Sequence, residues 1–537
     1  MTRTASDATV VIPRVTVPRQ RVAAPRPPLE PQPIREATPT RGRRVPPDVL
    51  IALGLTVLVL VVQAWNITGF PYASDDEGTY LAQAWAVRHG YGLAHYTYWY
   101  DHPPLGWIQL AGLAWIPSTL LPHALAVGTG RLAMLPVAAV SLLLVYPIVR
   151  RLGLARWAAA LAVLAYGLSP ISVTMMRQIY LDSFAVMWIL AAFALALSPR
   201  KHLWHHTAAG VAAGLAVLSK ETMLIALPGV VVALWQGTAK TPVRAWAFGG
   251  FTAGLVLVGV FYPLYAILKG ELIPGPGHVS LIGAWQFQLG NRHGSGSIFS
   301  AGTNSNSLLR SWLFYDGVLP IAGVAATLPA LAIRRLRGPA VAGALLILTA
   351  LRPGGYLPAM YVVQVLPFFA IVLAGVVAVT VDRLRPRWLR LSVAALAAAA
   401  AAALVAPQWY VGDRRALVSH DNAAYGQAAA WLDGGGVPDR GHTTVVVDDV
   451  LWLDLVDGGY QRDRVLWFYK LDLDSAVAAR LPHGYRDVDY LVSTPAVRQD
   501  PGSLPTVQQL LTHSTTVRTF GSGDGRIEIR RVTKETL

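Results

Sequence analysis

The sequence has no cysteine among its 537 residues, and it has little charge. Without cysteine the chain cannot form disulfide bonds, use a thiolate in catalysis or hold a metal through sulfur. Charged residues make up 14% of the chain and hydrophobic residues 54%, whereas soluble domains carry roughly 25% charged residues. This composition argues against a soluble multidomain protein.

The charge that is present is mainly positive, with 45 Lys and Arg against 30 Asp and Glu and a net charge of +15. The sequence shows no module that combines basic and aromatic residues in the way nucleic-acid-binding domains do. In membrane proteins an excess of Lys and Arg marks the cytoplasmic loops. We therefore interpret the charge as a signal of membrane topology and expect no nucleic-acid partner.

Apolar stretches of about twenty residues recur between residues 48 and 407, which predicts a polytopic helical membrane protein. Basic clusters lie between many of these stretches, and we assign them to the cytoplasmic side of the plasma membrane. With a cytoplasmic start, the pattern predicts eleven spans: 48–65, 124–149, 157–172, 183–198, 207–219, 222–236, 245–268, 311–333, 339–351, 358–381 and 388–407. The apolar run 104–121 is then an interfacial helix, and 207–236 is a hairpin that turns near Lys220.

The two ends of the chain differ from this middle part. Residues 1–47 hold nine Arg and three acids, with no apolar core behind the first charges as in a signal peptide. We expect a disordered, basic cytoplasmic tail there. Residues 408–537 are more charged and alternate in polarity, which predicts a small extracytoplasmic α/β domain. Its expected helices are 423–432, 473–480 and 504–513, and its expected strands are 443–447, 490–493 and 527–532.

Three consecutive acids, Asp75, Asp76 and Glu77, follow the first span by ten residues. Adjacent carboxylates repel one another, so at least one should have a raised pKa unless a cation compensates. A carboxylate of raised pKa in a partly dry cleft can act as a general base toward a hydroxyl group. The alternative is a solvated acidic loop. Three acids could also hold a divalent cation, although general-base activation of a hydroxyl requires no cofactor.

Aromatic and hydroxyl side chains crowd the same loop, from Trp85 to Tyr100. Such side chains suit sugar faces and lipid headgroups, and an interfacial aromatic belt is the competing explanation. We take five residues of this loop and of later segments as candidate substrate-binding residues: Tyr100, Asp101, His102, Asp182 and Tyr361.

Several cations fall on the predicted outer face, against the usual bias of membrane proteins. They are Arg131, Arg177, Lys220 and Arg352. Each of them alone fits an ion-paired structural residue, and Asp182 or a lipid phosphate is a candidate partner of Arg177. Together they predict a pocket for an anion, such as a phosphate or diphosphate leaving group.

Three motifs in this order and spacing carry a family resemblance: Asp76-Glu77, then His102-Pro103-Pro104-Leu105-Gly106, then Arg177 followed by Leu181-Asp182-Ser183. They resemble the protein O-mannosyltransferases and, more broadly, the GT-C glycosyltransferases that include the lipid A aminoarabinose transferases. The resemblance covers roughly residues 48–380. The chain departs from the mannosyltransferases at Trp107, where they have Lys, and it shows no obvious counterpart of the sugar-binding β-trefoil insert of the eukaryotic enzymes.

The resemblance implies an inverting glycosyltransferase of GT-C fold. The first-loop Asp would be the general base that activates an acceptor hydroxyl, which we assign to Asp76 with Asp75 as the second choice. The donor would be a polyprenyl-phosphate sugar held by cationic side chains. The acceptor would be a cell-envelope polymer, lipid or protein on the outer face, and the sugar would be a hexose or pentose.

Two other classes of function remain open at this point. A membrane transporter or lipid-linked sugar flippase would concentrate polar groups at the middle of the bilayer and often shows internal repeats. This chain instead carries its unusual charges in outer loops and at the ends of spans. A non-catalytic scaffold would use only the C-terminal domain, and its function would survive the substitution Asp76→Asn.

Overall fold

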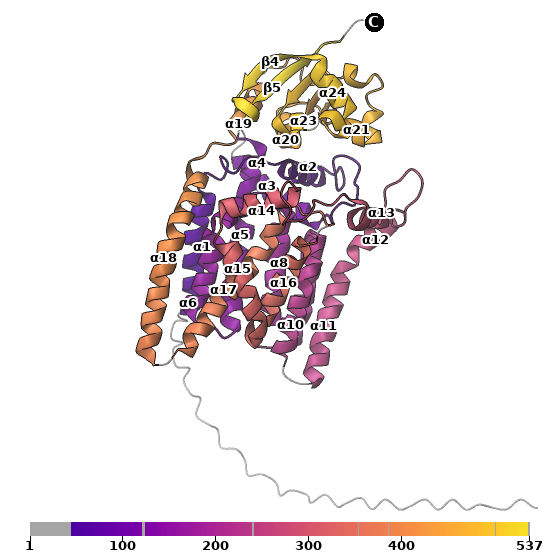
Figure 1. Cartoon of the computed structure of the whole chain (residues 1–537). Helices are drawn as coiled ribbons and strands as arrows, with labels where there is room; N and C mark the ends of the chain where they lie inside the picture. Colours follow the sequence, from indigo (N-terminus) through magenta and orange to yellow (C-terminus); the bar gives the residue numbers. More distant parts are fainter. Residues whose placement is uncertain are drawn as a thin grey trace, which may run out of the picture. The chain divides into compact units, whose positions relative to one another are not determined.

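The computed structural model describes residues 45–120, 124–238, 241–352, 354–384, 386–499 and 501–534. The predicted basic tail lies, through residue 44, outside the described residues. From Pro47 onward the chain forms one unit. In this unit a bundle of long helices carries an α/β domain at one end (Figure 1).

Most helices of the bundle follow the predicted apolar runs to within a few residues, because the apolar side chains of those runs pack against one another in one large core. They are α1 (Pro47–Ala64), α4 (Ala126–Leu132), α5 (Leu135–Arg151), α6 (Arg156–Leu168), α8 (Leu181–Ala196), α9 (Leu203–Ser219), α10 (Leu227–Gly237), α11 (Thr241–Gly259), α12 (Phe261–Leu268), α15 (Leu319–Ala332), α16 (Arg337–Ala350), α17 (Tyr361–Arg383) and α18 (Arg387–Val418).

Among the described residues, four helical stretches are long and apolar enough to cross a membrane, or up to six if each bent pair counts as one span. The predicted count of eleven stays a prediction. Two predicted spans are bent: α6 turns by 61° into α7 (Pro170–Arg177), and α14 (Asn304–Tyr315) turns by 102° into α15. A proline lies at the start of both second helices, and proline favours a new helix start over the continuation of an old one. Only the second part of the predicted span 311–333 therefore follows the bundle.

The C-terminal domain contains one five-stranded sheet in the order β2-β1-β3-β5-β4. β1 pairs in parallel with β2 and β3, and β5 pairs antiparallel with β3 and β4. The strands are β1 (Val445–Val447), β2 (Val465–Trp467), β3 (Tyr490–Ser493), β4 (Ser514–Phe520) and β5 (Ile527–Val532). Three of them match the predicted strands; β2, which has only three residues, and β4, whose side chains are mostly exposed, were not predicted.

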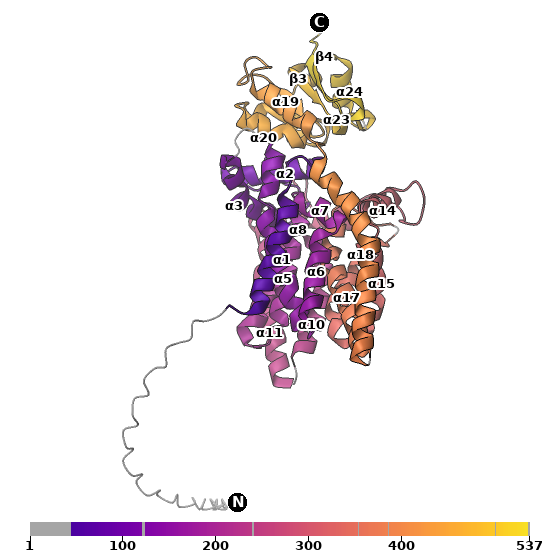
Figure 2. The same ribbon diagram turned by 90° about the vertical axis from the view of Figure 1, so that its left-hand side faces the viewer.

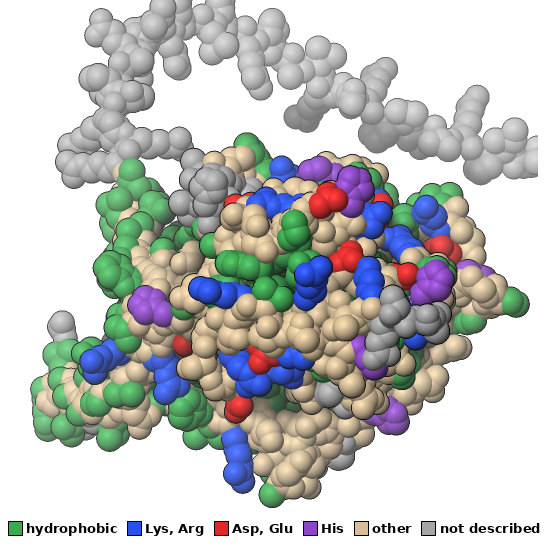
Figure 3. Space-filling model, turned by 90° about the horizontal axis from the view of Figure 1, so that it is seen from above, with side chains coloured by type: hydrophobic (Ala, Val, Ile, Leu, Met, Phe, Trp, Pro, Cys, Tyr) green, Lys and Arg blue, Asp and Glu red, His purple; other side chains and the backbone are tan. Residues whose placement is uncertain are grey.

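Helices flank this sheet, and the predicted helices are found among them (Figure 2). They are α19 (Ala423–Asp433), α20 (Asp449–Asp457), α21 (Lys470–Leu473), α22 (Ser475–Ala478), α23 (Pro495–Gln499) and α24 (Pro505–Thr512), with short 3-10 turns at Arg462–Arg464, Gly484–Asp487, Pro501–Ser503 and Gly523–Gly525. Basic, acidic and histidine side chains are scattered over the face seen from above (Figure 3).

Helix α18 is longer than predicted, because it continues from residue 407 to Val418. The indole Nε1 of Trp409 donates to Asp316 Oδ1 at 3.2 Å, and Gly412 packs closely on Pro170. These contacts stabilise the extra turns. The α/β domain consequently follows α18 near Ser419, whereas the predicted boundary was at residue 408.

We call the end of the bundle that lies next to the C-terminal domain the site pole. Two short helices lie there (Figures 1 and 2). They are α2 (Asp75–Arg88) and α3 (Leu105–Leu120). Helix α3 covers most of the run that the sequence predicts as an interfacial helix, and its interfacial position stays a prediction. The predicted hairpin is also present, since α9 ends at Ser219 and the chain returns through a 3-10 turn (Glu221–Ala226) into α10. The site pole also holds α13 (Leu281–Gln286), which a short π-helical turn (Phe287–Asn291) follows.

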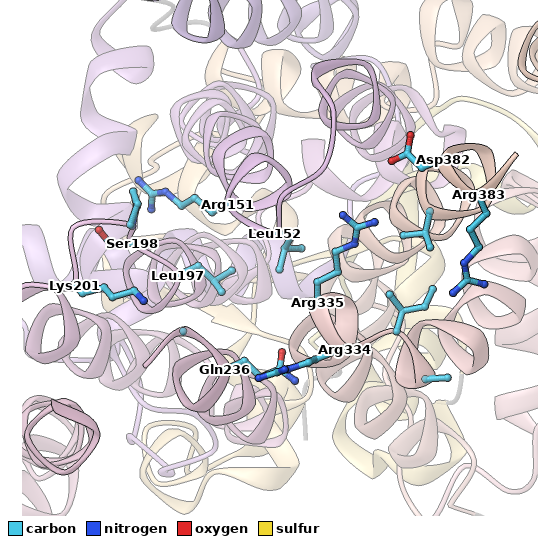
Figure 4. Close-up of a pocket in the computed structure, with 15 residues that line it drawn as sticks. Arg151, Leu152, Leu197, Ser198, Lys201, Gln236, Arg334, Arg335, Asp382 and Arg383 are labelled. Atoms are coloured by element: carbon cyan, nitrogen blue, oxygen red, sulfur yellow. The ribbon is translucent and has the colours of Figure 1, made fainter. Parts of the chain in front are cut away.

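The other end of the bundle, which we call the basic pole, gathers the basic clusters between the helices. Arg151, Lys201, Arg334 and Arg383 come from four separate connections and line one cavity there (Figure 4). The fold therefore brings to one end the clusters that the charge pattern assigns to one side of the membrane.

Candidate functional site

The three acids form the first turn of α2, and each has a different environment. The helix begins after Ser74, whose backbone N–H donates to Glu77 Oε2 at 3.1 Å. Acidic side chains in a first turn also interact favourably with the helix dipole. The helix start thus fixes three neighbouring carboxylates in three directions.

Glu77 is fully buried and forms a bidentate ion pair with Arg131 of α4, with Arg131 Nε to Oε1 at 2.8 Å and Nη2 to Oε2 at 2.7 Å. The backbone N–H of Ile179 donates to the same carboxylate at 3.1 Å, and Arg131 Nη1 donates to the Pro71 carbonyl at 2.7 Å. The pair therefore joins α2, α4 and the segment before α8. The predicted roles of Glu77 in catalysis and of Arg131 in phosphate binding stay predictions, but these contacts favour a positioning role for both.

Asp75 faces the C-terminal domain. Burial, and then the charges of Asp448 and Asp76, raise the pKa of Asp75 to about 7. Asp448 accepts hydrogen bonds from the Tyr425 hydroxyl at 2.7 Å and from the Leu451 N–H at 3.1 Å. Asp75 thus belongs to an acidic cluster shared between α2 and the start of α20.

The same cluster includes Asp449, which accepts from the hydroxyls of Thr79 and Tyr469. Gly78 of α2 lies so close to this segment that a Cβ atom on it would be 2.1 Å from the Asp449 carbonyl oxygen. The C-terminal domain is therefore packed directly on the helix that carries the three acids.

Asp76 is accessible to solvent, and no described residue donates a hydrogen bond to its carboxylate. The surrounding protein nevertheless displaces much of the water around the carboxylate, and this desolvation raises the pKa of Asp76. The positive charges of Lys220 and His102 act in the opposite direction. Asp101 is a further charged neighbour. Of the three acids, Asp76 is the one whose carboxylate is left for a ligand.

His102 lies between a cation and an anion. Lys220 Nζ is 2.8 Å from His102 Nε2, and His102 Nδ1 is 3.1 Å from Glu221 Oε1. A neutral imidazole with its proton on Nδ1 satisfies both contacts, because Lys220 then donates to Nε2 and Nδ1–H donates to Glu221. Burial alone would lower the pKa of His102, but the Glu221 carboxylate raises it above its ordinary value.

A second set of hydrogen bonds, made by Gln364 of α17, borders this cluster. Gln364 Nε2 donates to Asp182 Oδ1 at 2.5 Å and to Thr222 Oγ1 at 2.6 Å. Asp182 is fully buried at the start of α8, and Lys220 and His102 are among the charges that act on it. Tyr361, at the start of α17, has Glu221 and Asp182 as charged neighbours. The structure thus brings together Asp76, Asp101, His102, Asp182, Lys220 and Tyr361 from distant segments.

Three other predicted residues make their contacts elsewhere. Arg177 is buried and donates to the carbonyls of Val62 at 2.7 Å and Ala416 at 3.2 Å, so Asp182 is not its hydrogen-bond partner. Arg352 is exposed, with Nη2 3.5 Å from the Leu289 carbonyl. The Tyr100 hydroxyl donates to Glu271 Oε2 at 2.6 Å. Their predicted roles remain predictions.

The sequence prediction of site residues omitted four that the structure places in or beside the cluster. They are Glu221, Thr222, Gln364 and Arg292. Glu221 could have been found from its position next to Lys220 at the predicted hairpin turn. Arg292 lies over the Tyr356 ring at 3.5 Å and acts electrostatically on Tyr361, a contact that no local pattern signals. Within the described part of the chain, no three His, Asp or Glu side chains are arranged to hold a metal ion.

Comparison with known proteins identifies the fold that carries this arrangement. Residues 102–263 match the family described as dolichyl-phosphate-mannose-protein mannosyltransferase, a segment that includes His102, Asp182 and Lys220. The structure is similar to that of ArnT from Cupriavidus metallidurans bound to undecaprenyl phosphate, with a TM-score of 0.56 and 17% identity over 90% of this chain and 98% of that one. The chain has the GT-C fold. This result confirms the resemblance drawn from the motifs.

The fold is also similar to that of the oligosaccharyltransferase from Archaeoglobus fulgidus in the apo form, with a TM-score of 0.52 and 13% identity over 88% of this chain and 74% of that one. A comparison with curated protein sequences found no match. At these identities the solved structures establish the fold of the chain, and its function has to be argued from the site.

Proposed function

We propose that the protein is an inverting membrane glycosyltransferase that moves a sugar from a polyprenyl-phosphate donor to a hydroxyl acceptor on the outer face of the plasma membrane. The family match over residues 102–263 and the shared fold support this class of reaction. The similar ArnT structure was solved with undecaprenyl phosphate, which has the chemistry of the leaving group in such a reaction.

The observation that carries the proposal is the state of Asp76. Its carboxylate is accessible, has no hydrogen-bond donor among the described residues and lies beside a buried cation. It can therefore take the proton of an acceptor hydroxyl while that oxygen attacks the anomeric carbon. The bond from the anomeric carbon to the phosphate oxygen breaks in the same displacement. The proton then resides on Asp76, the sugar on the acceptor and the negative charge on the lipid phosphate.

Lys220 is the cation best placed to stabilise the departing phosphate. It is buried, and its ammonium group has His102 as its hydrogen-bond partner at 2.8 Å. The contact between His102 and Glu221 orients the imidazole, and the imidazole in turn fixes the ammonium group. A cation that is already oriented in a partly dry site stabilises developing charge without reorganisation.

The Glu77–Arg131 pair supplies the rigidity that this chemistry needs. It is bidentate and fully buried, and it lies one residue from the proposed base. Because effective catalysis requires reacting groups to be held close to the productive geometry, we assign both residues as positioning residues. Asp75 instead belongs to the contact with the C-terminal domain.

The test is sugar transfer by purified protein from radiolabelled polyprenyl-phosphate sugars, with Asp76→Asn and Asp75→Asn as matched variants. We expect Asp76→Asn to lower the rate by about 10²–10⁴-fold, the usual contribution of a general base, with donor binding retained. We expect Asp75→Asn to keep most of the rate. Absence of transfer with every donor, or full activity of Asp76→Asn, contradicts the proposal. A flippase would move the labelled lipid across vesicles without any transfer.

The predicted topology has a separate test. The chain after α18 should be extracytoplasmic, so a reporter fused to the C-terminus should signal the outer side. A cytoplasmic signal would place the acidic site on the inner face and contradict the proposed location of the reaction.

A further inference from the structure

The basic pole contains a cavity of about 830 Å³ that the proposed transfer reaction does not use. It lies where α5, α8, α10, α15 and α17 end, at the end of the bundle away from the C-terminal domain (Figures 1 and 4). Five basic side chains line it: Arg151, Lys201, Arg334, Arg335 and Arg383. Its volume is within the range of about 300–1,000 Å³ that small-molecule sites occupy.

The cavity has an excess of positive charge even when the helix ends are counted. Asp382 is the single carboxylate among the lining residues, which leaves a formal excess of four positive charges. Each helix C-terminus is equivalent to about half a negative charge, so five of them offset about 2.5 charges. About 1.5 positive charges then remain without an opposite charge in the lining.

Two of the five basic side chains are held by backbone carbonyls. Arg151 donates to the Ala194 carbonyl, and Arg335 Nη1 donates to the Gly153 carbonyl at 3.2 Å. These two arginines satisfy backbone carbonyls at or just after helix C-termini, a structural role that is common for cations there.

The other three basic side chains are exposed and are not held in this way by any described residue. No described residue accepts a hydrogen bond or forms an ion pair with Lys201, Arg334 or Arg383. Figure 4 shows the Asp382 carboxylate and the Arg383 guanidinium extending in opposite directions. Three cations from three different connections therefore remain at the cavity.

The rest of the lining is mixed in polarity. Leu152, Leu197, Ile333 and Val379 contribute apolar surface, while Ser198 and Gln236 contribute polar side chains. A bare inorganic ion would leave the apolar part in contact with water. An anion attached to an organic group would use both parts of the lining.

We propose that this cavity binds a phosphate monoester. Such a group carries about −1.5 to −2 charges near pH 7 and three strong acceptor oxygens, which matches the remaining charge and the three available cations. Arginine is well suited to phosphate because its planar N–H groups can donate in pairs. The same chemistry occurs on a lipid headgroup and on a soluble phosphate ester, and the experiment distinguishes the two sources.

The test uses the full-length protein in phosphatidylcholine nanodiscs. Binding of glycerol 3-phosphate is measured by calorimetry against chloride at equal ionic strength. In a second arm, phosphatidylcholine vesicles with and without phosphatidic acid are offered, and retained lipid is counted by native mass spectrometry. Binding in the first arm identifies a soluble ester, and selective retention in the second identifies a lipid. If the wild-type protein binds neither probe, the proposal is overturned.

The double variant Arg334→Ala/Arg383→Ala locates the site. Each arginine can make a charge-assisted hydrogen bond to the phosphate, so loss of two arginines should weaken binding by more than 10-fold. The control is Arg337→Ala, an exposed arginine of the same pole that donates to the Leu331 carbonyl at 3.0 Å and does not line the cavity. Unchanged binding in the double variant, or equal weakening in the control, would refute the assignment. Sugar transfer should be the same in all three proteins, which keeps this result separate from the proposed function.

Discussion

The contact between Gly78 and the C-terminal domain allows a sharp test of how α2 is positioned. A Cβ atom on Gly78 would lie 2.1 Å from the Asp449 carbonyl oxygen, and Cβ contacts shorter than 3.0 Å essentially never occur. The neighbours are backbone atoms, which cannot rotate away. In the variant Gly78→Ala, α2 must therefore withdraw from the start of α20 by about 0.9 Å, the difference between the two distances.

This shift should affect both stability and activity. Overpacking of this kind costs about 1–3 kcal/mol, and the better helix propensity of Ala returns only about 0.5–1 kcal/mol. Asp76 lies two residues from Gly78 on the same helix. Because a misplacement of about 1 Å can lower a rate by about 100-fold, we expect a transfer rate reduced by one to two orders of magnitude and a lower Tm.

The assay compares initial transfer rates and thermal unfolding of Gly78→Ala with those of Gly426→Ala. Gly426 lies in α19 of the C-terminal domain, and a Cβ atom there would meet nothing within 4 Å. The control should keep its rate and gain slightly in Tm, because Ala stabilises a helix relative to Gly. If Gly78→Ala has the rate and Tm of the wild type, the direct docking of α2 on α20 is wrong.

Three further predictions concern individual carboxylates. Glu77→Gln removes one partner of the buried pair and leaves Arg131 without a counter-charge, so it should destabilise the protein by about 3–5 kcal/mol in a thermal or denaturant unfolding assay. The transfer rate should fall as pH decreases through the raised pKa of Asp76, because the base must be unprotonated; an acid limb at or below the ordinary Asp pKa of about 3.9 would contradict this. Burial raises the pKa of Asp454 to about 8, so the native state binds a proton there that the unfolded chain has already lost above about pH 4. Stability should therefore fall as pH rises toward 8. The variant Asp454→Asn keeps an Oδ1 that can accept from Ala126 N–H. Its Tm, measured against pH, should depend less on pH than that of the wild type.

The sequence was sufficient to predict those parts of the molecule that depend on local pattern. Hydropathy located the helices of the bundle, and period-two alternation located three of the five strands. Six of the predicted site residues meet in space: Asp76, Asp101, His102, Asp182, Lys220 and Tyr361. They could be found because they lie in or beside the predicted outer loops, and charged or polar groups close to apolar runs are rare in membrane proteins unless they have a function.

Side-chain partners across the fold could not be predicted in the same way. Arg131 pairs with Glu77, 54 residues earlier in the chain, and Thr79 bonds Asp449, 370 residues later. Tertiary packing decides which polar groups are buried together, and one sequence contains no record of that choice. The bends between α6 and α7 and between α14 and α15 were missed for a related reason, because hydropathy averages over a window and does not detect a change of direction.

The length of α18 has a consequence for where the α/β domain begins relative to the membrane. Its 32 residues correspond to about 48 Å of helix, whereas the hydrocarbon core of a bilayer is about 30 Å thick. A helix that crosses as predicted therefore extends about 18 Å beyond the hydrocarbon, past the headgroup layer of about 5–8 Å. With that topology the α/β domain, which follows Val418, begins beyond the headgroup layer. The first turn of α2, on which that domain packs, then lies on the same side of the membrane.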